Sequence, residues 1–199
     1  MALEHRISEL DTYLFAKGTH YEIYEKMGAH LAEEDGKAGT YFSVWAPNAR
    51  SVSVVGDFNN WDRSAHPMQP VQQSGIWDIF VPGVKAGDLY KFAVETSQGY
   101  TVLKADPYGN QSQLRPDNAS VVADIRHFDW TDQAWRKAHQ EKKTESPMAI
   151  YEVHPGSWKK DPSMPGEFYN FKKLAVELAD YVLEMGYTHV ELIGLSEHP

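Results

Sequence analysis

A tryptophan on a polar turn is the residue of this chain best suited to hold a ligand. A β-branched run ends at Gly56, and the turn that follows carries Asp57, Asn59, Asn60 and Trp61. A flat indole ring can stack against the apolar face of a sugar, while amide and carboxylate groups beside it can bond the hydroxyls. The turn therefore indicates a sugar-binding surface centred on Trp61.

Lys91 is a second candidate for the same surface. It alternates with Tyr90 and Phe92 in a β-type run, so its side chain points to the face opposite these two aromatic rings. From that face its ammonium group could donate a hydrogen bond to a sugar hydroxyl. An alternative stays open, in which Trp61 folds back over a sheet edge and Lys91 is only solvated. The two aspartates flanking the turn are expected to shape it through local backbone hydrogen bonds.

The elements that must position these residues are short strands separated by Gly, Pro, Asn or Asp. The runs of β type are 41–45, 51–55, 76–81 and 89–94, with weaker additions at 100–103 and 120–122. Several short strands with turn signals between them predict an antiparallel, immunoglobulin-like β-sandwich of about 80 to 90 residues. The fold class is therefore expected to be mainly β.

Helices are expected before the sandwich, and a connector after it. Thr19 and Glu22 have capping-box spacing, and Gly28 stands where a helix would end. The predicted organisation is a helical lead (1–35), the sandwich (36–126), a connector (127–146) with a helix around 131–143, and a last segment (147–199).

The last segment has the pattern of one βαβ unit. A strand is predicted over 148–154, a helix between Asn170 as N-cap and Gly186 as terminator, and a second strand over 190–195. A closed (β/α)8 barrel needs about 200 residues or more, and a two-stranded parallel pair buries little apolar surface by itself. We therefore expect the start of an incomplete barrel whose remainder lies outside this sequence.

Composition narrows the choice of partners. The chain has 199 residues, a formal net charge of −9 and no cysteine. The negative charge disfavours nucleic acid and anionic membranes, and the missing thiols exclude disulfides. The nine histidines show no metal-binding spacing, so neither a metal nor a cofactor is expected. Without a signal-peptide or membrane-spanning pattern, the expected location is the cytoplasm.

Two motifs in the sandwich segment resemble the family 48 carbohydrate-binding modules. These are the turn GDFNNW, residues 56–61, and the strand YKF, residues 90–92. The resemblance implies binding of α-glucan, such as glycogen, amylose or maltooligosaccharides. In the family, the turn tryptophan, the strand lysine and a later aromatic residue contact the glucan. These positions correspond to Trp61, Lys91 and, after residues 97–99, Tyr100.

An ordered set of further motifs resembles the 1,4-α-glucan branching enzymes of the bacterial glycogen type. The set comprises YLF at 13–15, GTHYEIYEKMGAH at 18–30, ADPYG at 105–109, YEVHPGSW at 151–158 and MGYTHVEL at 185–192. Such enzymes cut an α-1,4-glucan and transfer the cut end to a 6-hydroxyl, which forms an α-1,6 branch. The resemblance implies retaining chemistry on a (β/α)8 barrel, with two carboxyl groups and no cofactor.

The resemblance also implies that this chain by itself is inactive. The family's nucleophile and acid/base motifs do not occur here and are expected beyond Pro199, so no catalytic residue is assigned. Tyr151, in the first strand of the βαβ unit, is the candidate accessory residue of the parent's active site. A structural role for Tyr151 is the alternative.

Two other functions stay open. The chain could be a free-standing α-glucan-binding regulatory module, which would explain its length but leave the βαβ unit without a purpose. It could also be a fragment of a debranching or trehalose-releasing glycoside hydrolase, which shares the sandwich and the barrel. In that case the leading segment and the first-strand motif would differ from those seen here.

Overall fold

A computed structural model describes all of the chain except residues 1–5, 127–128, 141–145, 165 and 196–199. The chain divides into two compact units, Met1–Asp129 and Trp130–Pro199. Each unit has its own sheet structure and is described by itself.

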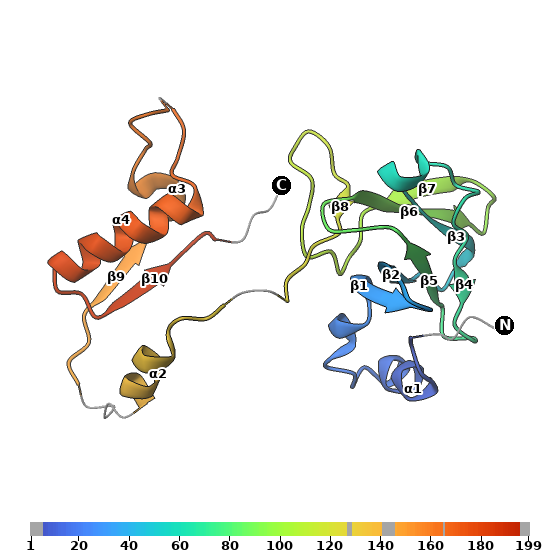
Figure 1. Cartoon of the computed structure of the whole chain (residues 1–199), viewed down its shortest axis with the longest axis horizontal. Helices are drawn as coiled ribbons and strands as arrows, with labels where there is room; N and C mark the ends of the chain where they lie inside the picture. The colour runs from blue at the N-terminus through green and yellow to red at the C-terminus, as the bar shows by residue number, and fades with distance from the viewer. Residues whose placement is uncertain (1–5, 127–128, 141–145, 165, 196–199) are drawn as a thin grey trace. The chain divides into compact units, whose positions relative to one another are not determined.

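The first unit is built from two antiparallel sheets (Figure 1). One sheet has the strand order β1-β2-β5-β4; the other has the order β3-β6-β7, with β8 also paired to β6. The strands are β1 (Gly28–Glu34), β2 (Lys37–Trp45), β3 (Ala49–Gly56), β4 (Gln69–Pro70), β5 (Ile76–Pro82), β6 (Leu89–Thr96), β7 (Thr101–Lys104) and β8 (Ser120–Val121). The immunoglobulin-like sandwich predicted from the sequence is confirmed.

The core lies between the sheets and is centred on three fully buried aromatic rings. Phe42 of β2 meets Tyr90 of β6 edge-on, with centroids 5.0 Å apart, and Tyr90 meets Phe92 at 5.8 Å. Val52 and Val54 of β3 are also fully buried. At the start of β6, the buried residues Tyr90 and Phe92 alternate with the half-buried Leu89 and Lys91. Along β3, all residues from Val52 to Gly56 are buried. This packing fixes the face on which each outward side chain lies.

The helical lead is shorter than the predicted 1–35. Helix α1 (Glu9–Lys17) and a 3-10 turn η1 (Ile23–Glu25) precede the sandwich, whereas β1 occupies residues that we expected to be helical. Gly28 starts this strand with a φ of 96° and does not cap a helix; a Cβ there would lie 3.0 Å from Tyr108 Cβ. Pairing with β2 along seven positions overrides the local helical pattern.

The helix cap also lies elsewhere. We expected a capping box at Thr19 and Glu22, but Glu22 makes no side-chain cap bond before η1. The capping box belongs to α1, where Ser8 Oγ accepts the backbone N–H of Asp11 at 3.2 Å and Asp11 Oδ2 accepts the N–H of Ser8 at 2.8 Å. An Asp in the last position of the box replaces the Glu or Gln of the usual pattern, which explains why the spacing was overlooked.

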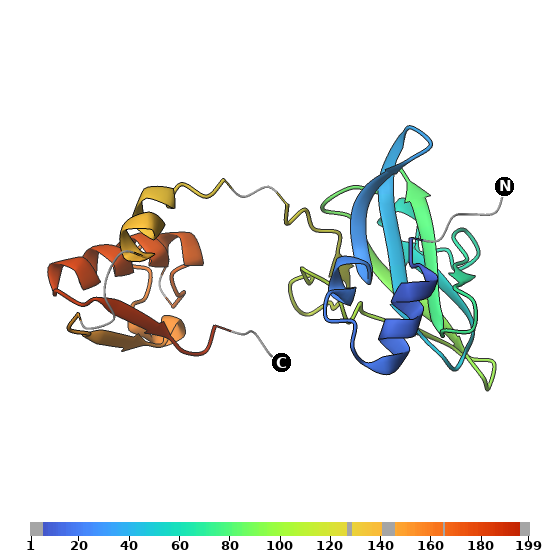
Figure 2. The ribbon, with the colours of Figure 1, turned by 90° about the horizontal axis from the view of Figure 1, so that it is seen from below.

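Asp11 is a buried carboxylate whose hydrogen bonds connect α1 with the residues between α1 and β1. Burial acts to raise its pKa, but hydrogen bonds from Lys26, Ser8 and His20 outweigh burial and hold the pKa well below its ordinary value. The distances from Asp11 oxygens are 2.5 Å to Lys26 Nζ and 2.8 Å to His20 Nε2. Figure 2 shows α1 against the sandwich. The ring centroids of Phe15 in α1 and Trp45 in β2 lie 5.9 Å apart.

We expect Asp11→Ala to destabilise the first unit by about 2 kcal/mol at pH 7, because charged hydrogen bonds to a buried carboxylate are lost. The folded pKa lies below the unfolded one, so this stabilisation is present above about pH 4 and disappears as pH falls further. Urea unfolding at pH 7 and pH 3 measures it, with exposed Asp117→Ala as the control. A deficit of equal size at both pH values would contradict this account.

The second unit contains the predicted βαβ arrangement. Its elements are α2 (Gln133–Gln140), β9 (Ile150–Val153), α3 (Pro155–Trp158), α4 (Phe171–Glu184) and β10 (His189–Leu192). Strands β9 and β10 pair in parallel, with His189 opposite Ile150. Asn170 caps α4 as predicted, with Oδ1 accepting the N–H of Lys173 at 3.0 Å. The end of the connector helix predicted over 131–143 lies outside the described residues.

Candidate functional site

The turn that presents Trp61 begins where β3 ends. Gly56 closes the strand, and a 3-10 turn, η2 (Asp57–Asn59), reverses the chain. Asn60 and Trp61 then take left-handed conformations, with φ values of 53° and 60°. The N–H of Trp61 donates to the carbonyl of Gly56 at 2.9 Å, which brings the tryptophan back to the end of β3. A bulky residue at positive φ is uncommon and must be held there by its surroundings.

Asn59 is the side chain that holds this turn. It is buried, its Oδ1 accepts the N–H of Gly56 at 2.9 Å, and its Nδ2 donates to the carbonyl of Val54 at 3.0 Å. Nδ2 also lies 2.8 Å from Nδ1 of His66. The amide of Asn59 is therefore used inside the turn, whereas Asn60 is exposed. Of the two amides that we expected beside a sugar, only that of Asn60 faces solvent.

The indole ring of Trp61 is fixed by a carboxylate. Its Nε1 donates to Oδ1 of Asp57 at 2.9 Å, and the ring is half-buried. A ring held by both backbone and side-chain bonds loses little freedom when a ligand stacks on it, so binding is less costly. Asp57 thus positions the ring, which extends the turn-shaping role predicted for it.

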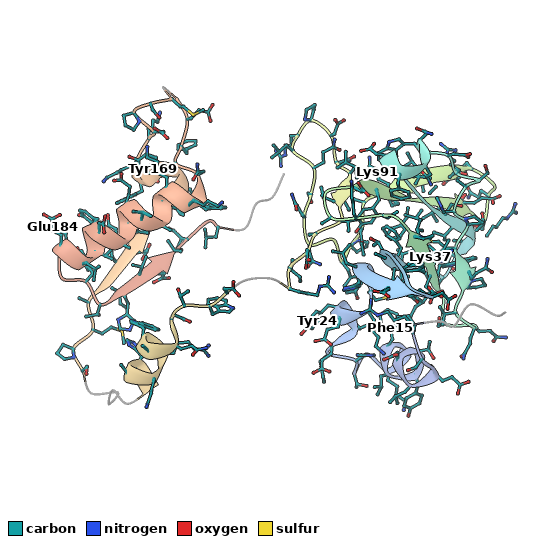
Figure 3. The ribbon with its side chains drawn as sticks, in the orientation of Figure 1. Phe15, Tyr24, Lys37, Lys91, Tyr169 and Glu184 are labelled. Carbon is teal, nitrogen blue, oxygen red and sulfur yellow. The ribbon has the colours of Figure 1, made fainter. Side chains whose placement is uncertain are left out.

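Lys91 lies on the outer face of β6. Its neighbours Tyr90 and Phe92 are fully buried, whereas Lys91 is half-buried, so the predicted opposition of faces agrees with the structure. Its Nζ donates to Oδ1 of Asn118 at 2.5 Å. An ammonium group has three donors, so this bond orients the group and leaves donors for a ligand. Figure 3 shows Lys91 on the sandwich, away from Phe15 of α1.

Trp61 and Lys91 belong to the same end of the β3–β6 pair. Val55 is the cross-strand partner of Lys91, and Gly56, which bonds the N–H of Trp61, is the partner of Tyr90. The register thus places the turn next to Lys91. We call Trp61, Asp57, Lys91 and Asn118 the Trp61 face.

Asn118 is the member of the Trp61 face that sequence reasoning missed. It lies 27 residues from Lys91 along the chain. The pairing of Ser120 in β8 with Tyr90 in β6 brings the two side chains together. Nothing local in the sequence marks Asn118, and only a prediction of this two-residue strand pairing could have found it.

Tyr100 lies at the other end of β6. It is exposed, and its carbonyl accepts from Thr96 through the backbone N–H at 2.9 Å and through Oγ1 at 3.1 Å. Thr96 is five residues beyond Lys91 on the strand, or about 16 Å at the usual rise. A ligand touching both Lys91 and Tyr100 would have to extend along β6.

Tyr151 belongs to the second unit and packs in an aromatic cluster. Its ring centroid lies 5.3 Å from that of Tyr181 and 4.9 Å from that of Tyr187, and Trp158 Nε1 donates to its hydroxyl at 3.1 Å. These contacts support the structural alternative that we kept open for Tyr151. Its role in an active site stays a prediction.

The described residues can also be compared with the requirements of a metal site and of a membrane-spanning helix. No group of three or more His, Cys, Asp or Glu side chains there is arranged to hold a metal ion. In the same part of the chain, no helix has the length and apolar character needed to cross a membrane.

If the Trp61 face holds the α-glucan that the resemblance implies, Asp57→Ala should weaken glucan retention by about threefold to tenfold, because it frees the indole ring without removing it. Losing one hydrogen bond of about 1 kcal/mol and restoring rotamer freedom gives this range. Affinity electrophoresis in amylose gels measures the effect, and Asp57→Asn, which can still accept from Nε1, is expected to stay within twofold of the wild type. A loss as complete as that from removing the ring would show that Asp57 itself contacts the ligand.

This chain is similar to several known proteins. The family model of carbohydrate-binding module 48 (isoamylase N-terminal domain) matches residues 26–109, which include Trp61, Lys91 and Tyr100. Solved structures share the fold. The pneumococcal, glycogen-degrading SpuA matches with a TM-score of 0.61 at 25% identity, covering 84% of this chain and 19% of its own. The GBS pullulanase SAP, solved with maltotetraose, matches with a TM-score of 0.61 at 21% identity, covering 87% and 24%.

Curated relatives are much more similar in sequence. The 1,4-alpha-glucan branching enzyme GlgB of Protochlamydia amoebophila is 52% identical over 96% of this chain and 26% of its own length. The GlgB of Butyrivibrio fibrisolvens is 50% identical over 97% of this chain and 30% of its own length. The chain thus spans between a quarter and a third of these relatives. Residues 26–109 match the carbohydrate-binding module 48 family, and the chain around them is similar to the N-terminal part of the 1,4-alpha-glucan branching enzymes of the GlgB type.

Proposed function

We propose that this chain is the N-terminal portion of a 1,4-α-glucan branching enzyme and that its sandwich binds α-glucan. The observation that carries the proposal is the identity of 46% to 52% with proteins of this name across 96% or more of the chain. Similarity to the pullulanase and to SpuA is only 21% to 25% and supports the fold more than the reaction. A debranching or trehalose-releasing parent is therefore less well supported.

The Trp61 face is the proposed glucan-binding surface of the module. It joins a fixed aromatic ring to an ammonium group and an exposed amide, Asn118, which is the chemistry a neutral polyhydroxylated chain requires. Tyr100 would contact the same glucan farther along β6. The net charge of −9 leaves a neutral ligand unaffected, so glucan binding should depend little on salt.

The second unit is proposed as the beginning of the catalytic barrel. All four residues of β10 are exposed, and its apolar side chains Val190 and Leu192 are about 40% accessible. Ile150 of the paired strand β9 is 52% exposed. Parallel sheets are ordinarily covered on both faces, so further barrel strands and helices would bury these residues. A free-standing module would leave this apolar surface uncovered.

We expect purified residues 1–199 to bind amylose weakly and to leave its iodine colour unaltered, because the paired carboxyl groups of the retaining reaction are not assigned to this chain. Retention in amylose gels tests the first half, and the absorption spectrum of the iodine complex tests the second. Retention without a colour change supports the proposal. A shift of the spectrum would contradict the inactivity, and no retention would contradict the binding role.

A further inference from the structure

A small pocket lies at the edge of the other sheet, on strand β1. It has a volume of about 80 Å³ and is lined by Arg6, Ala29, His30, Leu31, Asn110, Ala123, Ile125 and Arg126. None of these lining residues is acidic, and three carry side chains that are or can become cationic. In a chain with a net charge of −9, this concentration of basic groups is unusual. The pocket shares no residue with the Trp61 face.

Arg126 is anchored across the edge of β1. Its Nε lies 3.2 Å from Oδ1 of Asp124, and its Nη1 donates to the carbonyl of Leu31 at 3.4 Å. The guanidinium group has five N–H donors in a fixed planar fork. Within the described residues these contacts use the Nε and Nη1 sides, so the Nη2 side can still donate to a ligand.

Arg6 is the second arginine that lines the pocket. Its backbone N–H donates to the hydroxyl of Tyr41 at 3.0 Å, and its Cζ lies 5.6 Å from the centre of the same ring. Its Nη2 donates to the carbonyl of Glu25 at 3.4 Å. Arg6 thus keeps its charge at the pocket through contacts that do not neutralise it.

His30 lies where both arginine charges act. Burial lowers the pKa of its ring, and the charges of Arg6 and Arg126 lower it further, although a hydrogen bond with the carbonyl of Met27 opposes them. With Asp124 counted against the two arginines and His30 neutral, the group retains one positive charge. Both arginines are exposed to solvent, and their combined positive charge attracts anions to the pocket.

We propose that this pocket binds a phosphate-type oxyanion, free or as the ester of a small sugar, between Arg6 and Arg126. Arginine forks match the oxygens of such ions, and Asn110 adds an amide donor. A volume of about 80 Å³ equals that of two to three waters, which suits a tetrahedral ion of five heavy atoms.

An adjoining groove offers room for the organic part of an ester. It has a volume of about 410 Å³, shares Leu31 and Arg126 with the pocket, and adds Lys85 and Glu33 to its lining. The remaining lining is apolar or small, as suits a sugar ring held by its phosphate. The volumes of the groove and the pocket together leave room for a phosphorylated monosaccharide.

Amide chemical shifts of residues 1–199, titrated at constant ionic strength, test the proposal. The probes are inorganic phosphate, sulfate and glucose 6-phosphate. Saturable shifts at Ala29, His30 and Leu31 support it. Equal affinity for phosphate and the sugar phosphate assigns the site to free ions, and tighter binding of the sugar phosphate assigns it to esters. Shifts that do not saturate, or that spread evenly over surface lysines, would overturn it.

Variants separate the pocket from general charge effects. Arg126→Ala is expected to weaken phosphate binding at least tenfold, and Arg126→Lys, which keeps the charge but loses the fork, about threefold. Exposed Arg50→Ala removes the same charge elsewhere and should change binding less than twofold. Arg6→Ala removes the other arginine of the pocket and should also weaken phosphate binding. Equal weakening by Arg50→Ala and Arg126→Ala would reject the site.

Discussion

Trp61→Ala is expected to abolish measurable retention of this chain on amylose, with a loss of affinity of about 30-fold. Stacking on an indole ring removes on the order of 100 Å² of apolar surface from water, worth about 2 kcal/mol. That free energy corresponds to about 30-fold in the dissociation constant. The loss should exceed that of Asp57→Ala, because the ring itself disappears and not only its anchor.

Two controls make this test specific. Trp61→Phe keeps a flat ring but loses the bond from Nε1 to Asp57, so part of the retention should survive. Trp135→Ala removes a tryptophan that is 61% exposed in the other unit, so retention should be unchanged. If Trp135→Ala and Trp61→Ala reduce retention equally, the module does not bind glucan through the Trp61 face. Retention unchanged by Trp61→Ala would reject its role as a platform.

The sandwich could be predicted because the residues that mark each strand lie within the strand and in the turns beside it. Strands β2, β3, β5 and β6 are short runs of β type separated by turn residues, so each was found within a few positions of its bounds. Strand β1 was missed because nothing in Gly28–Glu34 distinguishes a strand from a helix end. Its conformation depends on β2, and a single sequence does not reveal which segments pair.

In the candidate site, too, the predictable residues are those marked by their neighbours in the sequence. Trp61 and Lys91 are marked by their own neighbours, so the turn and the strand were identifiable. The bond between Lys91 and Asn118 depends on β8 pairing with β6, a contact between distant segments. The buried role of Asn59 was not predictable from residue type, because its amide could equally have faced a ligand. Side-chain roles that depend on tertiary contacts were therefore the part that the sequence did not disclose.

Gly56→Ala is expected to cost about 3 kcal/mol or more of unfolding free energy, the largest stability effect among the substitutions considered. A Cβ at this position would lie 2.1 Å from the carbonyl oxygen of Leu89 and 2.5 Å from Cε1 of Phe58. The φ of −176° is ordinary extended backbone, so the cost comes from the clash and not from the conformation. Urea unfolding followed by tryptophan fluorescence measures it.

Gly83→Ala is the matched control for this substitution. Gly83 has a φ of 83°, and no heavy atom lies within 4 Å of the position that a Cβ would take there. Its substitution should therefore cost only about 1 kcal/mol, for the left-handed backbone. An equal cost at the two glycines would show that β3 and β6 can separate freely at Gly56.

The clash at Gly56 should also affect binding, because either way of relieving it disturbs the Trp61 face. If the backbone of Leu89 moves, β6 shifts at its start, two residues before Lys91. If Phe58 moves instead, the η2 turn, which contains Phe58 and carries Asp57, moves with it. The Phe58 ring also packs on Phe42, with the ring centroids 6.1 Å apart, so its movement would disturb that contact. Loss of retention in the folded Gly56→Ala variant, with retention kept in Gly83→Ala, would establish that the close approach of β3 and β6 sets the geometry of the proposed glucan-binding surface.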